Sequence, residues 1–215
     1  TQGYSSAASD VYKRQVLEYV GIKTTGVAAL VASAGVAIGL ALQGSLSNFA
    51  GGLVILLIRP FNVGDYVEGA GHNGVIEKIG MFYTHMVSVD NKLILVPNGT
   101  LANGSIVNYS AKELRRVDLT FGVGYEQDIL KVKRVLSNIV EAHDLILKTP
   151  EPFIALSNHG DSAINFVVRV WVNNSDYWKV HFDLLESVKV AFDNEDISIP
   201  YPQMDLHIKN EGLSK

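Results

Sequence analysis

No charged residue occurs between Lys23 and Arg59, a run of 35 positions in a chain of which 19% is charged. An α-helix needs about 20 mostly apolar residues to cross the hydrocarbon core of a bilayer, and about 17 at the lower limit. Residues 26–42, which are almost all Gly, Ala, Val and Leu, reach that limit before a polar break at residues 43–45. We therefore predict a membrane-spanning helix, with a buried hairpin helix of a soluble protein as the alternative on composition.

Small residues recur at spacings of three and four within residues 26–42, which places them on one side of a helix. These positions are Ala28, Ala32, Gly35 and Gly39. In water each such glycine costs about 1 kcal/mol relative to alanine, whereas in a membrane bundle small residues allow helix backbones to approach closely. The pattern therefore predicts helix–helix packing. A neighbouring stripe would line an axis if several copies packed around one, and it consists of Ala29, Val36 and Leu40.

The polar break at Gln43 and Gly44 is where we predict a kink, because glycine lowers the cost of bending a helix. Beyond it, residues 46–58 have the spacing of an amphipathic helix that could lie along the membrane interface. Its apolar positions are Leu46, Phe49, Ala50, Leu53, Val54 and Leu57, and the other face holds Ser47, Asn48, Gly51 and Gly52. Proline disfavours helix at the preceding residue, so Arg59-Pro60 is predicted to end this segment.

Composition excludes several classes of function. The chain has no cysteine, which rules out disulfides, thiolate metal sites and cysteine nucleophiles. Its net charge of −4 lacks the basic surface that nucleic-acid binding needs. The six histidines form no HxxxH or HExxH pair, so no metal site or cofactor is expected. Residues 69–74 spell GxGxxG, but residues 75–79 alternate as a strand, which favours a glycine-rich turn over a dinucleotide site and argues against an enzyme.

The remainder of the chain falls into two compositional halves. Residues 61–110 read as short strands and turns of a small all-β, Sm/SH3-like barrel module, with strands expected at 66–68, 74–79, 83–89 and 92–96 and a turn at Asn98-Gly99. From residue 115 the order βαββαβ indicates a ferredoxin-like α+β layer. Its expected strands are 116–123, 153–156, 163–172 and 204–208, and its expected helices are 127–143 and 176–193.

These patterns give the expected domain boundaries. Residues 1–15 are polar and small and are expected to be a non-native or disordered remnant. The other expected segments are the helical segment 16–59, the β domain 60–112, the α+β domain 113–203 and a C-terminal strand and tail 204–215.

The stretch GVAIGLALQGSLSNFAGGLVILLIRP at residues 35–60 closely resembles the pore helix of the small-conductance mechanosensitive channel (MscS) family. The resemblance continues in order through FNVGDYV, VPNG, INFVVRVW and IPYPQMD and covers roughly residues 16–210. It implies a pore-lining membrane helix followed by the β domain and the α+β domain. It also implies a homoheptamer in which seven such helices surround a pore above a hollow cytoplasmic cage.

The resemblance also assigns roles to individual positions. The two apolar rings of the pore constriction fall on Val36 and Leu40, and the first of these is more often leucine in the family. The kink falls on Gly44, next to Gln43, and Leu42 and Leu46 match positions thought to pass membrane tension to the pore. The small-residue seams of the helix packing fall on Ala32, Gly35 and Gly39 on one side and on Ala29, Ser33 and Ala37 on the other.

The function we expect is that of a tension-gated channel subunit that releases ions and small osmolytes on hypoosmotic shock. Its partners would be further copies of the chain, membrane lipids and the permeating solutes, in the inner (plasma) membrane with the C-terminal domains in the cytoplasm. The family has at least two membrane helices before the pore helix, so the native chain is expected to be multi-pass. The alternative is a membrane-tethered module that senses a soluble ligand without forming a pore.

Overall fold

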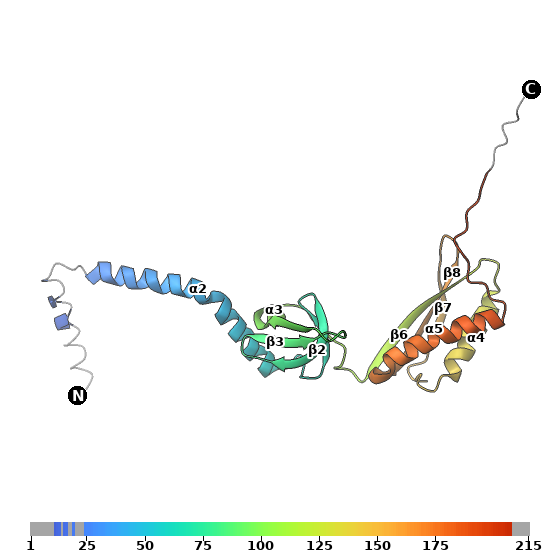
Figure 1. The fold of residues 1–215 in the computed structure, drawn as a ribbon, viewed down its shortest axis with the longest axis horizontal. Helices are drawn as coiled ribbons and strands as arrows, with labels where there is room; N and C mark the ends of the chain where they lie inside the picture. Colours follow the sequence, from blue (N-terminus) through green and yellow to red (C-terminus); the bar gives the residue numbers. More distant parts are fainter. Residues whose placement is uncertain (1–10, 14, 17–18, 20–23, 208–215) are drawn as a thin grey trace, which may run out of the picture. The chain divides into compact units, whose positions relative to one another are not determined.

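The computed structural model describes residues 11–13, 15–16, 19 and 24–207, and the sequence predictions for the other residues lie outside that part. The chain divides into two compact units between Tyr109 and Ser110. The first unit holds the long helix α2 and the strands β1–β5, and the second holds β6–β8 with α4 and α5 (Figure 1).

Helix α2 runs from Thr24 to Ile58 without interruption. In the described part of the chain, its residues Gly26–Ile58 form the one helix whose length and apolar composition would allow it to cross a membrane. The ribbon bends partway along, in the light-blue part (Figure 1). The helix ends because Arg59 adopts a left-handed conformation with φ of 52°, while its N–H still bonds to the Ile55 carbonyl at 2.8 Å. Arg59-Pro60 therefore ends the helix, as predicted.

The strands of the first unit, together with the segments that connect them after α2, form the β unit. Its sheet has five antiparallel strands in the order β4-β3-β2-β1-β5. Its strands are β1 Tyr66–Gly69, β2 His72–Ile79, β3 Tyr83–Val87, β4 Leu93–Pro97 and β5 Ile106–Asn108. One face of the sheet closes over an apolar core to which the end of α2 contributes Ile55. The other buried members of this core are Phe61, Val67, Ile76, Met86, Val96 and Leu101.

The GxGxxG segment is a hairpin turn between β1 and β2. Gly69 pairs with His72 in the register of the two strands, and the two residues between them, Ala70 and Gly71, have φ of 54° and 77°. Two positive φ values in a two-residue loop define the tight hairpin turn that suits the twist of paired strands. The prediction of a glycine-rich turn in place of a dinucleotide site is thereby confirmed.

The prediction of a turn at Asn98-Gly99 was wrong. These residues begin the short helix α3, Asn98–Asn103, which contacts α2 extensively. Sequence alone favoured a turn because Asn-Gly is a strong turn signal. The tertiary partner of this segment overrides that local preference.

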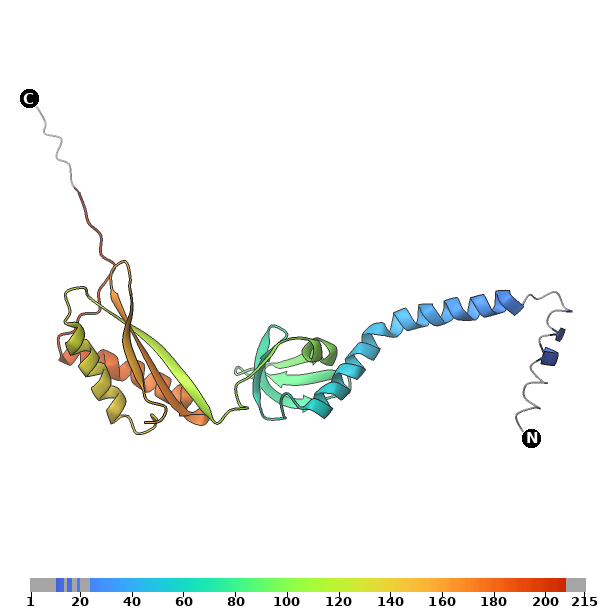
Figure 2. The ribbon, with the colours of Figure 1, turned by 180° about the vertical axis from the view of Figure 1, so that it is seen from behind.

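The second unit has a three-stranded antiparallel sheet in the order β6-β8-β7, with α4 and α5 on one face (Figure 2). Its elements are β6 Leu114–Val123, α4 Ile129–Ala142, β7 Phe153–His159, β8 Ile164–Asn173, a 3-10 turn Asn174–Asp176 and α5 Tyr177–Asn194. Helix α4 begins at the cap Asp128, whose carboxylate accepts the Leu130 N–H at 2.8 Å. Alternate residues of β6 and β8 point into the core with the apolar faces of the two helices.

The expected last strand, at residues 204–208, is not formed. Met204–His207 have no strand geometry, and residue 208 lies outside the described part. A strand needs a hydrogen-bonded neighbour, whereas the described residues 204–207 are assigned no strand, and the bond nearby runs from the Gln203 N–H to the Ser162 hydroxyl at 3.0 Å. The βαββαβ order is therefore observed up to its fifth element.

Candidate functional site

The first half of α2 is exposed on every side in this chain. Val36 and Leu40, the predicted pore-constriction residues, are 64% and 67% exposed. Leu42 and Leu46, the predicted tension-transmitting residues, are also exposed. A water-soluble protein rarely exposes so continuous an apolar surface, and nothing in the part of the chain that the structure describes covers it.

The predicted ring and seam residues form adjacent stripes along α2. At roughly 100° per residue, Val36 and Leu40 project in nearly the same direction. The stripe of Ala32, Gly35 and Gly39 lies about a quarter-turn to one side of them. The second small-residue stripe, Ala29, Ser33 and Ala37, lies about 40° to the other side. Like helices packed in a ring would therefore offer one small-residue stripe to each neighbour and point Val36 and Leu40 toward the axis between them.

The glycines in this half have no partner within the described chain. A Cβ atom added at Gly26, Gly35, Gly39 or Gly44 would meet no atom within 4 Å, the helix's own nearby backbone aside. Ser33 bonds within the helix, donating its hydroxyl to the Leu30 carbonyl at 2.9 Å. No described residue therefore accounts for glycine at these positions.

The second half of α2 docks on the β unit through two glycines. A Cβ atom at Gly51 would lie 2.7 Å from the Asn98 backbone carbonyl, and one at Gly52 would lie 2.6 Å from the Met81 carbonyl oxygen. Real Cβ contacts are never this short, so only glycine allows α2 to approach α3 and the β2–β3 turn at this distance. The docking is therefore fixed by side-chain volume.

Asn98 links the docking surface to the sheet and is fully buried. Its side-chain oxygen accepts the hydroxyl hydrogen of buried Thr84 at 2.8 Å, and its side-chain nitrogen donates to the Gly80 carbonyl at 2.9 Å. Its backbone N–H donates to the Phe82 carbonyl at 2.9 Å. One residue at the start of α3 thus satisfies three groups of the β2–β3 hairpin, as buried polar groups require.

Asn48 completes the docking from the helix side. Its side-chain oxygen accepts the Gly99 N–H at 3.0 Å, a bond between residues 51 positions apart. Gly99 is also tightly placed, because a Cβ atom there would lie 2.9 Å from the same Asn48 oxygen. The N–H at the start of α3, which has no partner within its own helix, is therefore bonded by α2.

The polar and glycine-rich face of residues 46–58 is thus the buried one, and the apolar face with Leu46, Leu53 and Leu57 is exposed. Sequence reasoning separated these two faces but assigned no partner to the polar one. The signal that could have identified this contact is the combination of Gly51-Gly52 with the Asn-Gly pair after β4.

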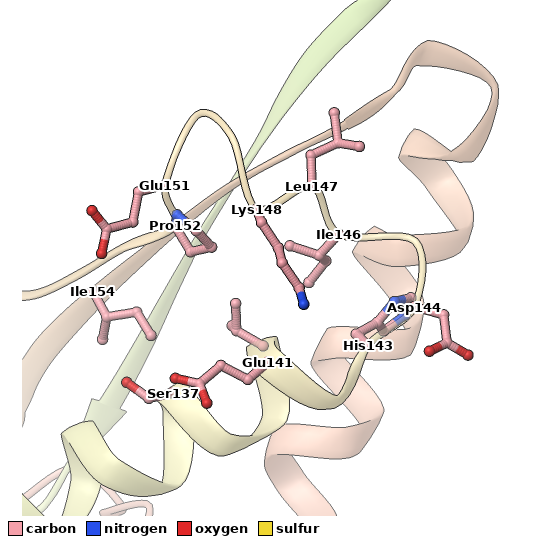
Figure 3. A pocket seen from close by; sticks show the side chains of 11 residues that line it. Ser137, Glu141, His143, Asp144, Ile146, Leu147, Lys148, Glu151, Pro152 and Ile154 are labelled. Atoms are coloured by element: carbon pink, nitrogen blue, oxygen red, sulfur yellow. The ribbon is translucent and has the colours of Figure 1, made fainter.

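The second unit has an open hollow of about 860 Å³ between the end of α4 and the loop that leads to β7. Its floor includes Val140, Ile146 and Ile154, and Figure 3 shows the Lys148 side chain extending from the loop toward α4. Glu141 and Glu151 lie at its exposed rim. Among the described residues, no three His, Asp or Glu side chains are grouped closely enough to hold a metal ion.

Comparison with known protein families agrees with this architecture. Residues 44–111 match the family model of the mechanosensitive ion channel β-domain, and residues 117–199 match that of the C-terminal domain of the mechanosensitive ion channel MscS. The chain belongs to the MscS family. This family consists of channels and not of enzymes, in agreement with the sequence-based expectation.

Two relatives show the extent of the similarity. The small-conductance mechanosensitive channel of Edwardsiella ictaluri is 48% identical over 176 residues, which are 82% of this MscS-family chain and 62% of the relative. An MscS-family protein of Buchnera aphidicola is 42% identical over 192 residues, which are 89% of this chain and 68% of the relative. This chain thus spans somewhat less than two thirds of the Edwardsiella channel.

A solved structure shows the same fold. The crystal structure of Helicobacter pylori MscS in its closed state superposes with a TM-score of 0.86 at 34% identity, over 91% of this chain and 78% of that one. The predicted succession of an apolar membrane-type helix, a β domain and an α+β domain is therefore confirmed for this MscS-family chain.

Proposed function

We propose that the chain is a subunit of a tension-gated ion channel that releases ions and small osmolytes on hypoosmotic shock. The observation that carries the proposal is the first half of α2, where exposed Val36 and Leu40 lie between two small-residue stripes that contact no other element among residues 24–207. Further copies of the same helix would fill both stripes. We take the assembly to be a homo-oligomer and, by the family resemblance, a heptamer.

In such a ring, Val36 and Leu40 form the gate. A narrow apolar constriction blocks ions without a plug, because confined water leaves it and an ion would have to lose its hydration shell to pass. Valine is shorter than leucine, so the constriction at Val36 is wider than the one at Leu40. Leu40 is therefore the tighter barrier in this chain.

Membrane tension opens the channel by favouring the state with the larger area in the plane of the membrane. Small-residue seams let neighbouring helices slide and tilt with little steric obstruction. Exposed Leu42 and Leu46 would receive the force from lipid or from preceding membrane helices. Gln43 and Gly44 would absorb the change of direction, because the second half of α2 is held by its contacts with Asn98 and Gly99.

We place the channel in the inner (plasma) membrane as part of a multi-pass chain, with the strands β1–β5 and the whole second unit in the cytoplasm. This orientation follows the family resemblance and leaves the charge-free helix as the segment in the lipid. The surrounding lipids and the permeating ions are then its other partners.

The test is a pressure-ramp patch recording on channel-deficient spheroplasts that express the chain with membrane helices supplied upstream. We expect discrete tension-activated currents, and we expect Leu40→Ser to wet the gate, so that the pore leaks at rest and induction slows growth. Leu56→Ser, an exposed leucine in the docked half, is the matched control and should leave resting leakage unchanged. Silence at lytic tension, with the protein present in the membrane, would contradict the proposal and favour a tethered ligand sensor.

A further inference from the structure

The hollow between the end of α4 and the loop that leads to β7 has room for a small molecule. Its volume of about 860 Å³ falls within the range of small-molecule sites, which is roughly 300–1,000 Å³. Val140 and Ile146 are buried in its floor, beside half-buried Ile154. A ligand with a short carbon skeleton would therefore cover apolar surface there.

The walls of the hollow are held in place without a ligand. The loop is bonded to β8, because the Leu147 N–H donates to the Trp171 carbonyl at 2.8 Å. His143, at the end of α4, joins the loop to α5: its Nδ1 accepts the Leu145 N–H at 3.3 Å, and its Nε2 lies 3.3 Å from the Asp183 carboxylate. A ligand that binds here therefore loses little free energy to ordering the loop.

Charged groups of both signs surround the apolar floor. Lys148 extends from the loop toward the end of α4, which carries Glu141, and Glu151 lies further along the loop, whereas Asp144 points away from the hollow (Figure 3). Among the residues that the structure describes, Lys148, Glu141 and Glu151 form no ion pair. One ammonium and two carboxylates are thus left to bind a ligand.

This mixture of charges decides between classes of ligand. A simple anion attracted by Lys148 would be repelled by Glu141 and Glu151, and a simple cation attracted by the glutamates would be repelled by Lys148. A molecule with a carboxylate and a cationic nitrogen a few carbons apart meets an opposite charge at each end. Exposed ion pairs each contribute little, so its Kd should be on the order of 1 mM.

We propose that this hollow binds a small zwitterion with one carboxylate and one cationic nitrogen, the chemistry that amino acids and betaines share. Lys148 binds the carboxylate, Glu141 and Glu151 bind the cationic nitrogen, and the apolar floor covers the carbon skeleton. The binding needs no pore and goes beyond the proposed function. Its consequence rests on that function, because a site that binds such solutes at millimolar concentration empties as the channel releases them.

Saturation-transfer difference NMR on the full chain in a non-ionic detergent tests this proposal, with glycine betaine as the probe and protein-free detergent as the blank. Two matched compounds each lack one charge. Choline has the cationic nitrogen without the carboxylate, and 3,3-dimethylbutanoate has the shape and carboxylate of betaine without the positive charge. We expect a saturable betaine signal and about fivefold weaker binding of either analogue.

Substitutions in the hollow identify the site. Lys148→Gln and Glu141→Gln should each weaken betaine binding about fivefold, because each removes a charge that the zwitterion meets. Lys148→Gln should also reverse the preference in favour of choline, an effect that a merely structural role of Lys148 would not produce. Lys78→Gln and Glu77→Gln, at exposed positions of β2, are the matched controls and should leave betaine binding unchanged.

The possible failures are distinguishable. Equal binding of betaine and choline to the wild-type chain would make the hollow a cation site and overturn the inference. The absence of a saturable betaine signal, or a signal that Lys148→Gln and Glu141→Gln leave unchanged, would overturn it as well. In each case the proposed function would still be decided by the patch recording, which does not depend on the hollow.

Discussion

The two halves of helix α2 contain the same kinds of residue in opposite surroundings. In the first half, a Cβ atom added at Gly35 or Gly39 would touch nothing in the described chain, whereas at Gly51 or Gly52 it would collide with backbone atoms. Glycine in the second half is thus explained by a partner that the chain contains. Glycine in the first half has no such explanation among the residues that the structure describes.

The two halves of α2 therefore differ in what holds them in place. The second half is fixed to the β unit by close packing and by the Asn48–Gly99 bond. Among the described residues, the first half makes hydrogen bonds only within its own helix, and under the proposed function its position would be set by neighbouring helices and lipid. A force on the first half therefore acts on a helix that is anchored at one end.

The largest effect is expected from Gly52→Ala, which tests whether the second half is truly anchored. The new methyl group would lie 2.5 Å from the Asn98 amide nitrogen and 2.6 Å from the Met81 carbonyl oxygen, and the backbone carbonyl cannot move aside cheaply. We expect the free energy of unfolding of the β unit to fall by about 3 kcal/mol. Thermal unfolding in detergent, followed by near-UV circular dichroism, measures this loss, and an unchanged midpoint would refute the docking.

A smaller loss is expected from Asn98→Ala. It leaves the buried Thr84 hydroxyl and the Gly80 carbonyl without their partner, which costs about 1–3 kcal/mol. Asn73→Ala, at an exposed position of β2, is the control and should change the free energy of unfolding by less than about 0.5 kcal/mol. Equal midpoints for the two variants would mean that the buried network does not stabilise the unit.

Asn48→Ala should weaken the docking of α2 on the β unit by about 1 kcal/mol. It removes the acceptor of the Gly99 N–H, and this N–H is only partly buried. Hydrogen exchange of the Gly99 amide is the sensitive readout, and we expect its protection to fall about fivefold or more. Protection at the wild-type level would indicate that packing alone holds α2 in place.

Gly39→Val is expected to leave the folding of the single chain unchanged, within about 0.5 kcal/mol, because the position is open and both residues are poor helix formers. Its effect should instead be seen in the assembled channel, where a bulky side chain obstructs sliding between helices and raises the opening tension. A pressure ramp that gives the wild-type opening threshold would contradict the proposal that neighbouring helices pack through the stripe containing Gly39.

Much of the fold could be predicted from the sequence, because the charge-free run, the period-two strands and the amphipathic helices such as 127–143 are local patterns. The short helix α3 could not, since Asn98-Gly99 resembles a turn until its contact with Gly51 is known. The expected strand at 204–208 is not formed at residues 204–207, the part that the structure describes, because strand formation depends on a neighbouring edge.

In the candidate site, too, the positions that follow a local pattern could be predicted, and the contacts between residues far apart in the sequence could not. The ring and seam positions on α2 were predicted from periodicity and from the family resemblance, and their roles stay predictions because their partners would be other copies. The anchor around Asn98 was missed because it joins residues about 50 positions apart, and no local pattern records such a contact.

The most direct test asks whether other copies of the chain pack against the small-residue stripes in the first half of α2. A chain with Ala37→Cys and Gly39→Cys places one thiol on each small-residue side, and two residues apart on a helix these thiols cannot bond to each other. Mild oxidation in native membranes should give a ladder of disulfide-linked multimers whose top band counts the subunits. Val31→Cys with Ile38→Cys, on the side turned away from Val36 and Leu40, should give none. Monomer alone from the seam pair would contradict the account.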